Sequence, residues 1–365
     1  MPFLVLFGLP ALVGIVFFRL LPGITWQELL VQMVAQMIVA GLSVGIIYHA
    51  STSDMEVLNG IVTGKESVRV HCGHSYQCHC HQVCTGSGKQ RSCHRQCSTC
   101  YRHPFDQDWH VDSSLDQTTL INRIDPQGLR EPARWTVAQV GEPYAAEHSY
   151  LNYIKAAPGS LFRRQGLVEK YTGDLPPFPA QVEDYYRRNA LVLVHGALVS
   201  EPRRWNRQLA EINGRLGASK KVDVALVLVR DLPQEYFYAL EQHWIGAKKN
   251  SAVLVIGVGQ DLAPRWATVM SWTTSEILKV RLRDAVMDLP RVDRDLVLPL
   301  FEREVVAHFL HRPMKDFAYL ASSIAPTPIE WAISMLIGLL ISLGLTWAFH
   351  RYDVFGTEHG TRRNR

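Results

Sequence analysis

Three long apolar runs lie near the two ends of the chain, and the sequence between them is polar enough to dissolve in water. The runs are Phe3–Leu21, Leu29–Tyr48 and Trp331–Phe349. A helix needs about 20 apolar residues to cross the core of a bilayer, so each run predicts a transmembrane helix. The first two are joined by a brief connection and form a predicted helical hairpin over residues 1–49. The third is assigned to residues 329–350, and a basic tail follows at residues 351–365.

The first run has a second interpretation, as a cleaved signal peptide. A signal peptide begins with a basic segment, whereas the first eighteen residues contain no Lys or Arg. A second apolar run also follows at once. The sequence therefore favours a retained helix over a signal peptide.

Basic residues beside the runs predict the orientation in the membrane. Arg19 lies on the loop side of the first run, and the tail carries Arg351, Arg362, Arg363 and Arg365. Segments that stay in the cytoplasm are enriched in Lys and Arg. We therefore expect an integral protein of a bacterial inner membrane, with its C-terminal tail in the cytoplasm and its large soluble region in the periplasm.

Polar and small residues inside the runs indicate close packing of helices. They are Gln32, Gln36, Gly41 and Gly45 in the second run and Ser334, Gly338 and Ser342 in the third. Residues four apart share one helix face, and faces of this kind let helices approach closely in lipid. The plainer explanation is that small residues are common in membrane spans. Besides the lipid bilayer, the partners expected from these faces are another membrane protein or a second copy of the chain.

From residue 190 the apolar pattern alternates between buried strands and amphipathic helices. The predicted strands are Leu191–Val194, Val222–Val229, Ser251–Val258 and Trp266–Trp272. The predicted helices are 201–217, where Gly217 is expected to end the helix, 233–243, 274–286 and 295–311. Strands that alternate with helices predict an α/β fold with a mainly parallel sheet sandwiched by helices. We assign this domain to residues 190–325.

Residues 111–189 have no clear periodicity and many proline and glycine breaks. We expect an irregular connector here, with short β-like pieces such as Arg134–Val140 and the start of a helix at Val182–Asn189. Aromatic side chains in this stretch are more often core than ligand contacts, and we expect them to attach the connector to its neighbour. They are Trp135, Tyr144, Tyr150 and Tyr153.

All seven cysteines lie in one short segment, within a region of residues 50–110 that also holds seven of the fifteen histidines. The cysteines are Cys72, Cys78, Cys80, Cys84, Cys93, Cys97 and Cys100. The histidines are His71, His74, His79, His81, His94, His103 and His110. A short polar segment cannot bury enough apolar surface to order itself, so this concentration predicts bound metal or disulfides.

Two interpretations of the cysteines stay open. Cys97 and Cys100 form a CxxC, which lets two thiolates bind one tetrahedral ion, and seven cysteines with His103 supply enough ligands for two zinc ions. The alternative is disulfides, which persist outside the cytoplasm, although an odd count leaves one cysteine over. The density of histidines favours zinc in a structural role. The predicted ligands are Cys72, Cys78, Cys80, Cys84, Cys93, Cys97, Cys100 and His103.

The segment Cys84–Gly88 resembles the end of the CxxCxGxG repeat in the zinc domain of DnaJ-type chaperones. The preceding cysteine is Cys80, which leaves three residues between the cysteines where the family has two. The resemblance covers about one repeat, and the CxxC at Cys97 lacks the glycines that would follow. We take the segment as a similar zinc-knuckle turn rather than as evidence of common descent.

Part of the α/β region resembles the TPM domain family. Trp244–Ile256 is similar to the family's W-x-I-G-x-K-x-x-N-G-V-L-L-L segment, and Val194–Ser200 is similar to the turn that opens the family's first helix. The resemblance spans about 130 residues, 190–320. It implies a domain tethered to a membrane and lying outside the cytoplasm. Some members are linked to phosphatase activity or to divalent metal binding through acidic loop residues, and others assist membrane complexes.

Asp231 and Asp261 are the acidic candidates for such a site, because they follow strand ends, where α/β sheets place ligands. The chain departs from the family close by. His195 and Gly196 stand where the family has an acidic residue or Asn, and Ser251 replaces a glycine. A divalent cation held by Asp231, Asp261 and His195 would imply a phosphatase. Ordinary loop acids and helix caps are the plainer explanation of both aspartates.

Charge and missing motifs exclude two classes of function. The formal net charge of +4 is small and its basic pairs are scattered, so no nucleic-acid partner is expected. No G-x-S-x-G nucleophile elbow follows His195 and Gly196, which excludes an α/β-hydrolase.

The sequence predicts a membrane-anchored accessory or scaffold protein, in which a structural zinc module and a TPM-like domain bind a partner. No catalysis is expected of such a protein. One alternative is a TPM-type divalent-metal-dependent phosphatase. Another is a thiol redox or metal-handling membrane protein that uses Cys97 and Cys100.

Overall fold

The chain divides into two units in the computed structural model. The model describes residues 2–21, 24–86, 92–157, 166–183, 187–196, 199–352 and 354–355. The first unit comprises Met1–Asp54, Ser149–Leu161 and Pro313–Arg365, and the second comprises Met55–His148 and Phe162–Arg312.

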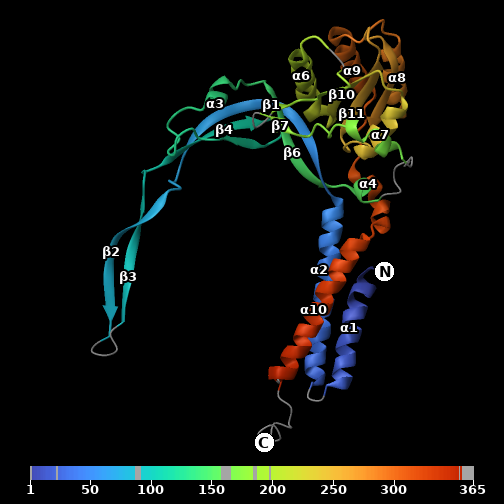
Figure 1. Cartoon of the computed structure of the whole chain (residues 1–365). Coiled ribbons are helices and arrows are strands. Elements are labelled where there is room, and N and C mark those ends of the chain that lie inside the picture. The colour runs from blue at the N-terminus through green and yellow to red at the C-terminus, as the bar shows by residue number, and fades with distance from the viewer. Residues whose placement is uncertain are drawn as a thin grey trace, which may run out of the picture. The chain divides into compact units, whose positions relative to one another are not determined.

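Three helices make up most of the first unit. They are α1 (Pro2–Leu20), α2 (Trp26–Thr52) and α10 (Pro328–Tyr352), and they pack side by side (Figure 1). By length and composition, α2 and α10 are long and apolar enough to cross a membrane, whereas the apolar part of α1, Val5–Leu20, is shorter. Two short elements, α4 (Tyr153–Ala156) and η4 (Met314–Ser323), pack on each other in the same unit.

Polar side chains lie at the contact between α2 and α10. Gln32 donates from Nε2 to Oγ of Ser342 (2.8 Å) and to Oγ1 of Thr346 (3.2 Å). One turn further along α2, Gln36 donates from Nε2 to the Gly338 carbonyl (3.2 Å). The side chains that point away from this contact are apolar and exposed. They include Leu30, Met37, Ile38, Leu42 and Ile46 on α2 and Leu336, Leu340, Leu343 and Trp347 on α10.

One of the predicted small-residue faces is used within the chain itself. On α10, Ser342 donates from Oγ to the Pro10 carbonyl of α1 (3.0 Å), and a Cβ on Gly338 would lie 2.9 Å from the Pro10 ring. Gly41 and Gly45 on α2 are exposed. The face of α10 is therefore occupied by α1 and α2, whereas the GxxxG face of α2 stays open.

The second unit contains an antiparallel sheet that the sequence did not predict. In spatial order its strands are β5 (Thr118–Ile121), β4 (Asp106–Ser113), β1 (Ser53–Val70) and β6 (Pro143–Leu151). Strand β4 runs antiparallel to both β1 and β5. Its small core is formed by Val62, Trp109, Val111, Ile121, Ala138 and Tyr144.

The irregular connector predicted for residues 111–189 is thus partly regular. Strand β5 has only four residues, and the apolar residues of β6 do not alternate, so neither gives a periodic signal. Both belong to a sheet whose longest strand, β1, precedes the connector. Pairing across such a distance leaves no local pattern in the sequence.

The β-like segment Arg134–Val140 was wrongly predicted, because helix α3 (Ala133–Val137) covers its first four residues. The helix places Trp135 against Trp109, with ring centroids 4.6 Å apart, and Trp135 donates from Nε1 to the His110 carbonyl (2.9 Å). A tertiary contact therefore selects the helix over the strand that the β-branched and aromatic residues favour.

The prediction that a helix starts at Val182–Asn189 was also wrong. Its described residues form two short paired strands, β7 (Val182–Glu183) and β8 (Arg187–Arg188). Arg188 is buried and ion-paired with Asp223. Burial lowers the pKa of Arg188 to about 9, which leaves the guanidinium charged at neutral pH. This buried ion pair holds the chain in the extended conformation.

The α/β part of the second unit has a four-stranded sheet. In spatial order the strands are β12 (Pro264–Ser271), β11 (Ser251–Val258), β10 (Asp223–Arg230) and β9 (Leu191–Val194). The longer helices are α6 (Pro202–Lys220), α7 (Glu235–His243), α8 (Glu276–Met287) and α9 (Arg294–His308). The shorter ones are α5 (Leu167–Lys170) and η3 (Thr172–Asp174). Every residue of β11 is buried, as expected for a strand covered on both faces.

The mixed α/β class is present, but the description "mainly parallel" was wrong for the chain as a whole. Strands β9, β10 and β11 are parallel, whereas β12 runs antiparallel to β11. The sheet around β1 is antiparallel as well. The prediction of parallel neighbours holds only for β9, β10 and β11, which are separated by α6 and α7. A helix between two strands lets the second strand run parallel to the first.

Candidate functional site

The cysteine-rich segment forms a two-stranded hairpin of β2 (Ser75–Thr85) and β3 (Ser92–Tyr101). Three disulfides join the strands: Cys78–Cys100, Cys80–Cys97 and Cys84–Cys93. The hairpin has little buried apolar surface of its own. Disulfides therefore take the place of a hydrophobic core in this element.

Six of the eight predicted zinc ligands are thus oxidised pairs. The ligand for zinc is a thiolate, so the structure favours disulfides over zinc at Cys78, Cys80, Cys84, Cys93, Cys97 and Cys100. Cys97 and Cys100 bond to different partners across the hairpin, so the CxxC is not itself a redox pair. The cysteine left over is Cys72, which is buried.

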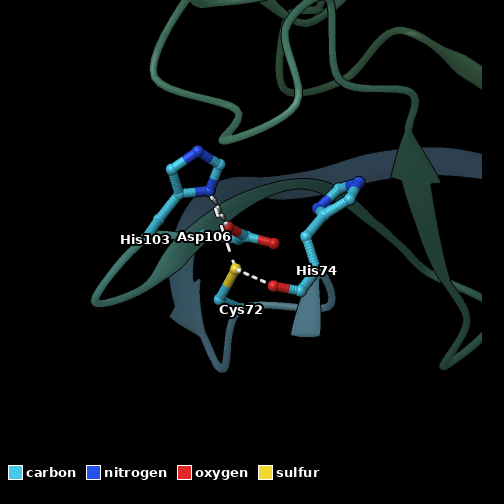
Figure 2. Close-up of side chains that lie close together, drawn as sticks. All are labelled: Cys72, His74, His103 and Asp106. Atoms are coloured by element: carbon cyan, nitrogen blue, oxygen red, sulfur yellow. Dashed lines mark hydrogen bonds and ion pairs between the residues drawn. The ribbon is translucent and has the colours of Figure 1, made fainter. Parts of the chain in front are cut away.

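Cys72 belongs to a cluster of four potential metal ligands at the root of the hairpin. The cluster contains Cys72 and His74, which lie between β1 and β2, together with His103 and Asp106, which lie between β3 and the start of β4. Their ligand atoms all lie within 4.8 Å of one another. Figure 2 shows the two imidazoles on either side of the Asp106 carboxylate, with the Cys72 sulfur beside them.

The strand register explains why these four residues meet. Val70, the last residue of β1, is paired with Asp106, the first residue of β4. The chain leaves β1 into the hairpin and returns from it into β4, so the residues just after β1 and just before β4 face each other. Cys72 and Asp106 are buried, His103 is partly exposed, and His74 is exposed.

Asp106 is held in place through one of its two oxygens. Oδ2 accepts from the backbone N–H of Gly73 (3.0 Å) and from Nη1 of Arg123 (2.7 Å). These two contacts, with the Gly73 bond the stronger influence, hold the pKa of Asp106 well below its usual range. The other oxygen, Oδ1, faces His103, so a carboxylate ligand atom is left pointing into the cluster.

The two distances from His103 to its neighbours match those in a tetrahedral zinc site. Nδ1 of His103 lies 3.6 Å from Sγ of Cys72 and 3.2 Å from Oδ1 of Asp106. With bonds of about 2.3 Å to sulfur and about 2.0 Å to nitrogen or oxygen, the ligand atoms of a tetrahedral zinc lie about 3.3 to 3.6 Å apart. A thiolate, two imidazoles and a carboxylate are a donor set that zinc accepts.

A Cys–His–Asp catalytic triad does not fit the same residues. In such a triad the carboxylate binds the imidazole nitrogen that faces away from the nucleophile. Here one nitrogen, Nδ1 of His103, faces both Cys72 and Asp106. The imidazole of His103 therefore cannot take a proton from Cys72 on one nitrogen while Asp106 holds the other nitrogen. A metal ion bound by all three side chains is compatible with this arrangement.

The sequence predicted two members of this cluster, Cys72 and His103, and missed the other two. The spacings Cys72-x-His74 and His103-x2-Asp106 were visible. Neither spacing is specific for a metal site on its own, whereas the CxxC at Cys97 is a known zinc-ligand spacing. The anchoring of Asp106 by Arg123, a residue 17 positions away, has no local signal in the sequence.

The acidic residues of the α/β part lie at a separate place. Asp231 and Asp261 line one open hollow of about 610 Å³ at the ends of β10 and β11. Both carboxylates lie near arginines, Arg230 (3.4 Å) and Arg265 (3.6 Å). His195 does not line this hollow, and its Nε2 lies 2.7 Å from Oδ1 of Asp174. The structure thus places the two aspartates together and His195 apart from them.

The chain matches no protein family model, no curated protein and no solved structure.

Proposed function

We propose that the chain is a membrane-anchored accessory protein whose soluble part presents a disulfide-stapled arm, β2–β3, held at its root by one zinc ion. The ligands in this proposal are Cys72, His74, His103 and Asp106. The observation that carries it is their convergence at the place where β1 and β4 continue into the hairpin. Four protein ligands leave no open position, which is typical of a structural rather than a catalytic zinc.

The anchoring in a membrane is supported by the distribution of polarity in the first unit. Gln32, Gln36 and Ser342 are buried between helices, while the outward side chains of α2 and α10 are apolar. A soluble bundle has the opposite arrangement. Large exposed apolar surfaces mark contact with a membrane or another protein, and helices in lipid use polar side chains to associate.

The location outside the cytoplasm is supported by the three disulfides. Cytoplasmic thiols are kept reduced, and structural disulfides form and persist in oxidising compartments. This agrees with the orientation expected from the basic tail. The compartment is tested by trapping thiols with an alkylating agent before lysis. Six cysteines that stay unmodified because they are in disulfides support the proposal. Six cysteines that react with the alkylating agent contradict it.

The metal is tested on the full chain, purified in mild detergent without reducing agent. We expect about one zinc per chain in the unchanged protein and a loss of zinc in Cys72→Ser and in Asp106→Ala. His94→Ala is the matched control, because His94 is an exposed histidine of the same hairpin outside the cluster. Thiol labelling gives an independent readout: Cys72 should react only after a chelator has removed the ion.

Two results would contradict the metal proposal. One is the absence of zinc from the unchanged protein. The other is an equal loss of zinc in His94→Ala and Cys72→Ser, which would place the ion elsewhere on the hairpin.

A TPM-type phosphatase is the second candidate. The observation that favours it is that Asp231 and Asp261 line the same hollow at the carboxyl ends of parallel strands, where α/β sheets bind ligands. Turnover of a generic phosphate ester with added divalent cation tests it. Activity that is lost in both Asp231→Ala and Asp261→Ala would support a divalent cation in this domain, and activity unchanged by either would exclude it.

A further inference from the structure

The positive charge of the chain is concentrated in the hairpin and the residues beside it. Residues 67–105 contain no Asp or Glu, although 34 of the 365 residues are acidic, so 39 residues of average composition would contain about four. The basic residues of this segment are Arg69, Lys89, Arg91, Arg95 and Arg102. The rest of the chain has 33 basic and 34 acidic residues. The net positive charge therefore lies in this one segment. From the basic pairs in the sequence, we expected it to be scattered along the chain.

The charged side chains of this segment are accessible. Arg69, Arg95 and Arg102 are exposed. Among the described residues, no ion pair joins Arg69, Arg95 or Arg102 to an acidic side chain. A concentrated, uncompensated positive surface favours an anionic partner.

The hairpin also has unpaired strand edges. Strands β2 and β3 pair with each other and with no other described strand (Figure 1). Each outer edge therefore presents backbone N–H and C=O groups that can pair with an added strand. The three disulfides fix the register and limit the twist of the pair, so the edge is already ordered before a partner binds.

We propose that the outer edge of β3 binds an extended acidic polypeptide as an additional strand. Arg95 in β3 and Arg102 just after it lie seven residues apart, so they meet carboxylates on opposite faces of that added strand. The proposal rests on the proposed function, because it names the partner that the arm holds. Charge alone would also suit anionic lipid. The segment Ser87–Arg91 between the strands contains no apolar residue that could enter a bilayer, and backbone edges have no role in binding headgroups. An acidic polypeptide can use both the positive charge of the hairpin and the unpaired backbone edge of β3.

The test measures binding of a short fluorescent peptide of Glu-Glu pairs separated by Thr-Thr pairs to the full chain in mild detergent. Extended, this peptide has carboxylates on both of its faces. We expect Arg95→Glu/Arg102→Glu to weaken binding at least roughly tenfold. The matched control is Arg203→Glu/Arg207→Glu, which makes the same change of charge on exposed positions of α6 and should leave binding unchanged. A peptide with Lys in place of Glu should not bind.

A second peptide tests the strand pairing. Methylation of alternate backbone nitrogens removes the donors along one edge of the peptide without changing its charge. We expect binding to be lost with this peptide. Equal binding of the methylated and unmethylated peptides would overturn the pairing with β3. Equal weakening by the hairpin and α6 variants would overturn the placement on the hairpin.

Phosphatidylglycerol vesicles and single-stranded DNA serve as competitors in the same assay. Preferential binding of either over the peptide would overturn the proposal. Zinc is measured on the same samples, which separates the two proposals. Zinc without peptide binding would contradict the acidic partner alone, and peptide binding without zinc would contradict the metal-held root alone.

Discussion

Gly217, on helix α6, lies directly against the backbone carbonyl of Asn59, on strand β1, so that a Cβ on Gly217 would collide with it. One turn earlier, a Cβ on Gly214 would lie 3.1 Å from the Gly60 carbonyl. The Asn59 side chain donates from Nδ2 to Oδ1 of Asp223 on β10 (2.9 Å). The antiparallel sheet and the α/β sheet of the second unit are therefore joined through backbone contact between α6 and β1.

This contact predicts that Gly217→Ala destabilises the protein. In an exposed helix the same change would stabilise by up to about 1 kcal/mol, because Ala is the better helix former. Here the added methyl group must push α6 away from β1, which costs about 1–3 kcal/mol. Chemical denaturation of the full chain, followed by tryptophan fluorescence, measures the free energy of unfolding. Gly173→Ala is the control, because nothing lies within 4 Å of a Cβ there. A Gly217→Ala protein as stable as the unchanged one would refute the contact.

The same glycine shows where local sequence rules fail. The apolar spacing correctly predicts helix α6, and Trp205, Leu209, Ile212 and Leu216 are all buried. The helix was expected to end at Gly217, but it continues to Lys220. A glycine ends a helix when the chain needs positive φ, and it stays inside a helix when a neighbouring backbone comes close. The sequence of the helix alone cannot separate these two uses.

The candidate site was predictable only in part, for a similar reason. The concentration of cysteine and histidine located the cysteine-rich segment. Even after one of the seven cysteines is set aside, the other six permit fifteen pairings, and the sequence does not choose among them. The choice depends on the register of β2 with β3, in which Cys84 lies opposite Cys93. The cluster at the root depends on the pairing of Val70 with Asp106, which is a property of the unpredicted antiparallel sheet.

The register predicts a specific disulfide map. Peptide mapping of the full chain under non-reducing conditions should recover Cys78–Cys100, Cys80–Cys97 and Cys84–Cys93. Cys72 should be recovered as a thiol. Recovery of a Cys97–Cys100 disulfide, or of Cys72 in any pair, would contradict the structure of the hairpin.

The buried glutamines predict that polar contacts hold the helices of the first unit together. Gln32→Ala removes the hydrogen bonds from Nε2 to Ser342 and Thr346. Such contacts contribute roughly 0.6–2 kcal/mol in lipid, so helix dissociation in a denaturing detergent should need less detergent. Gln27→Ala is the control, because Gln27 is an exposed glutamine of the same helix. Equal effects of the two changes would exclude the contact as a source of stability.

Asp125 predicts a pH dependence of stability in the second unit. Its carboxylate accepts from the backbone N–H groups of Arg130 (2.8 Å), Gly128 (2.7 Å), Leu129 (3.3 Å) and Gln127 (3.1 Å). These bonds, the one from Arg130 foremost, lower the pKa of Asp125. The loop matters to the core beneath it, because the Gly128 carbonyl accepts from Nε1 of the buried Trp109 (2.9 Å).

A carboxylate whose pKa is lowered by folding adds stability at any pH above its unfolded pKa, about 3.9. That stability is lost as the pH falls through the lower folded pKa. We therefore expect Asp125→Ala to melt below the unchanged protein at pH 7, and the gap to close as the pH falls below about 4. Thermal melts of the full chain across this range measure the gap. Glu131→Ala, at an exposed acid of the same loop, should show no such gap at pH 7. A gap for Asp125→Ala that stayed constant down to the lowest pH would mean that the side chain acts through its packing rather than its charge.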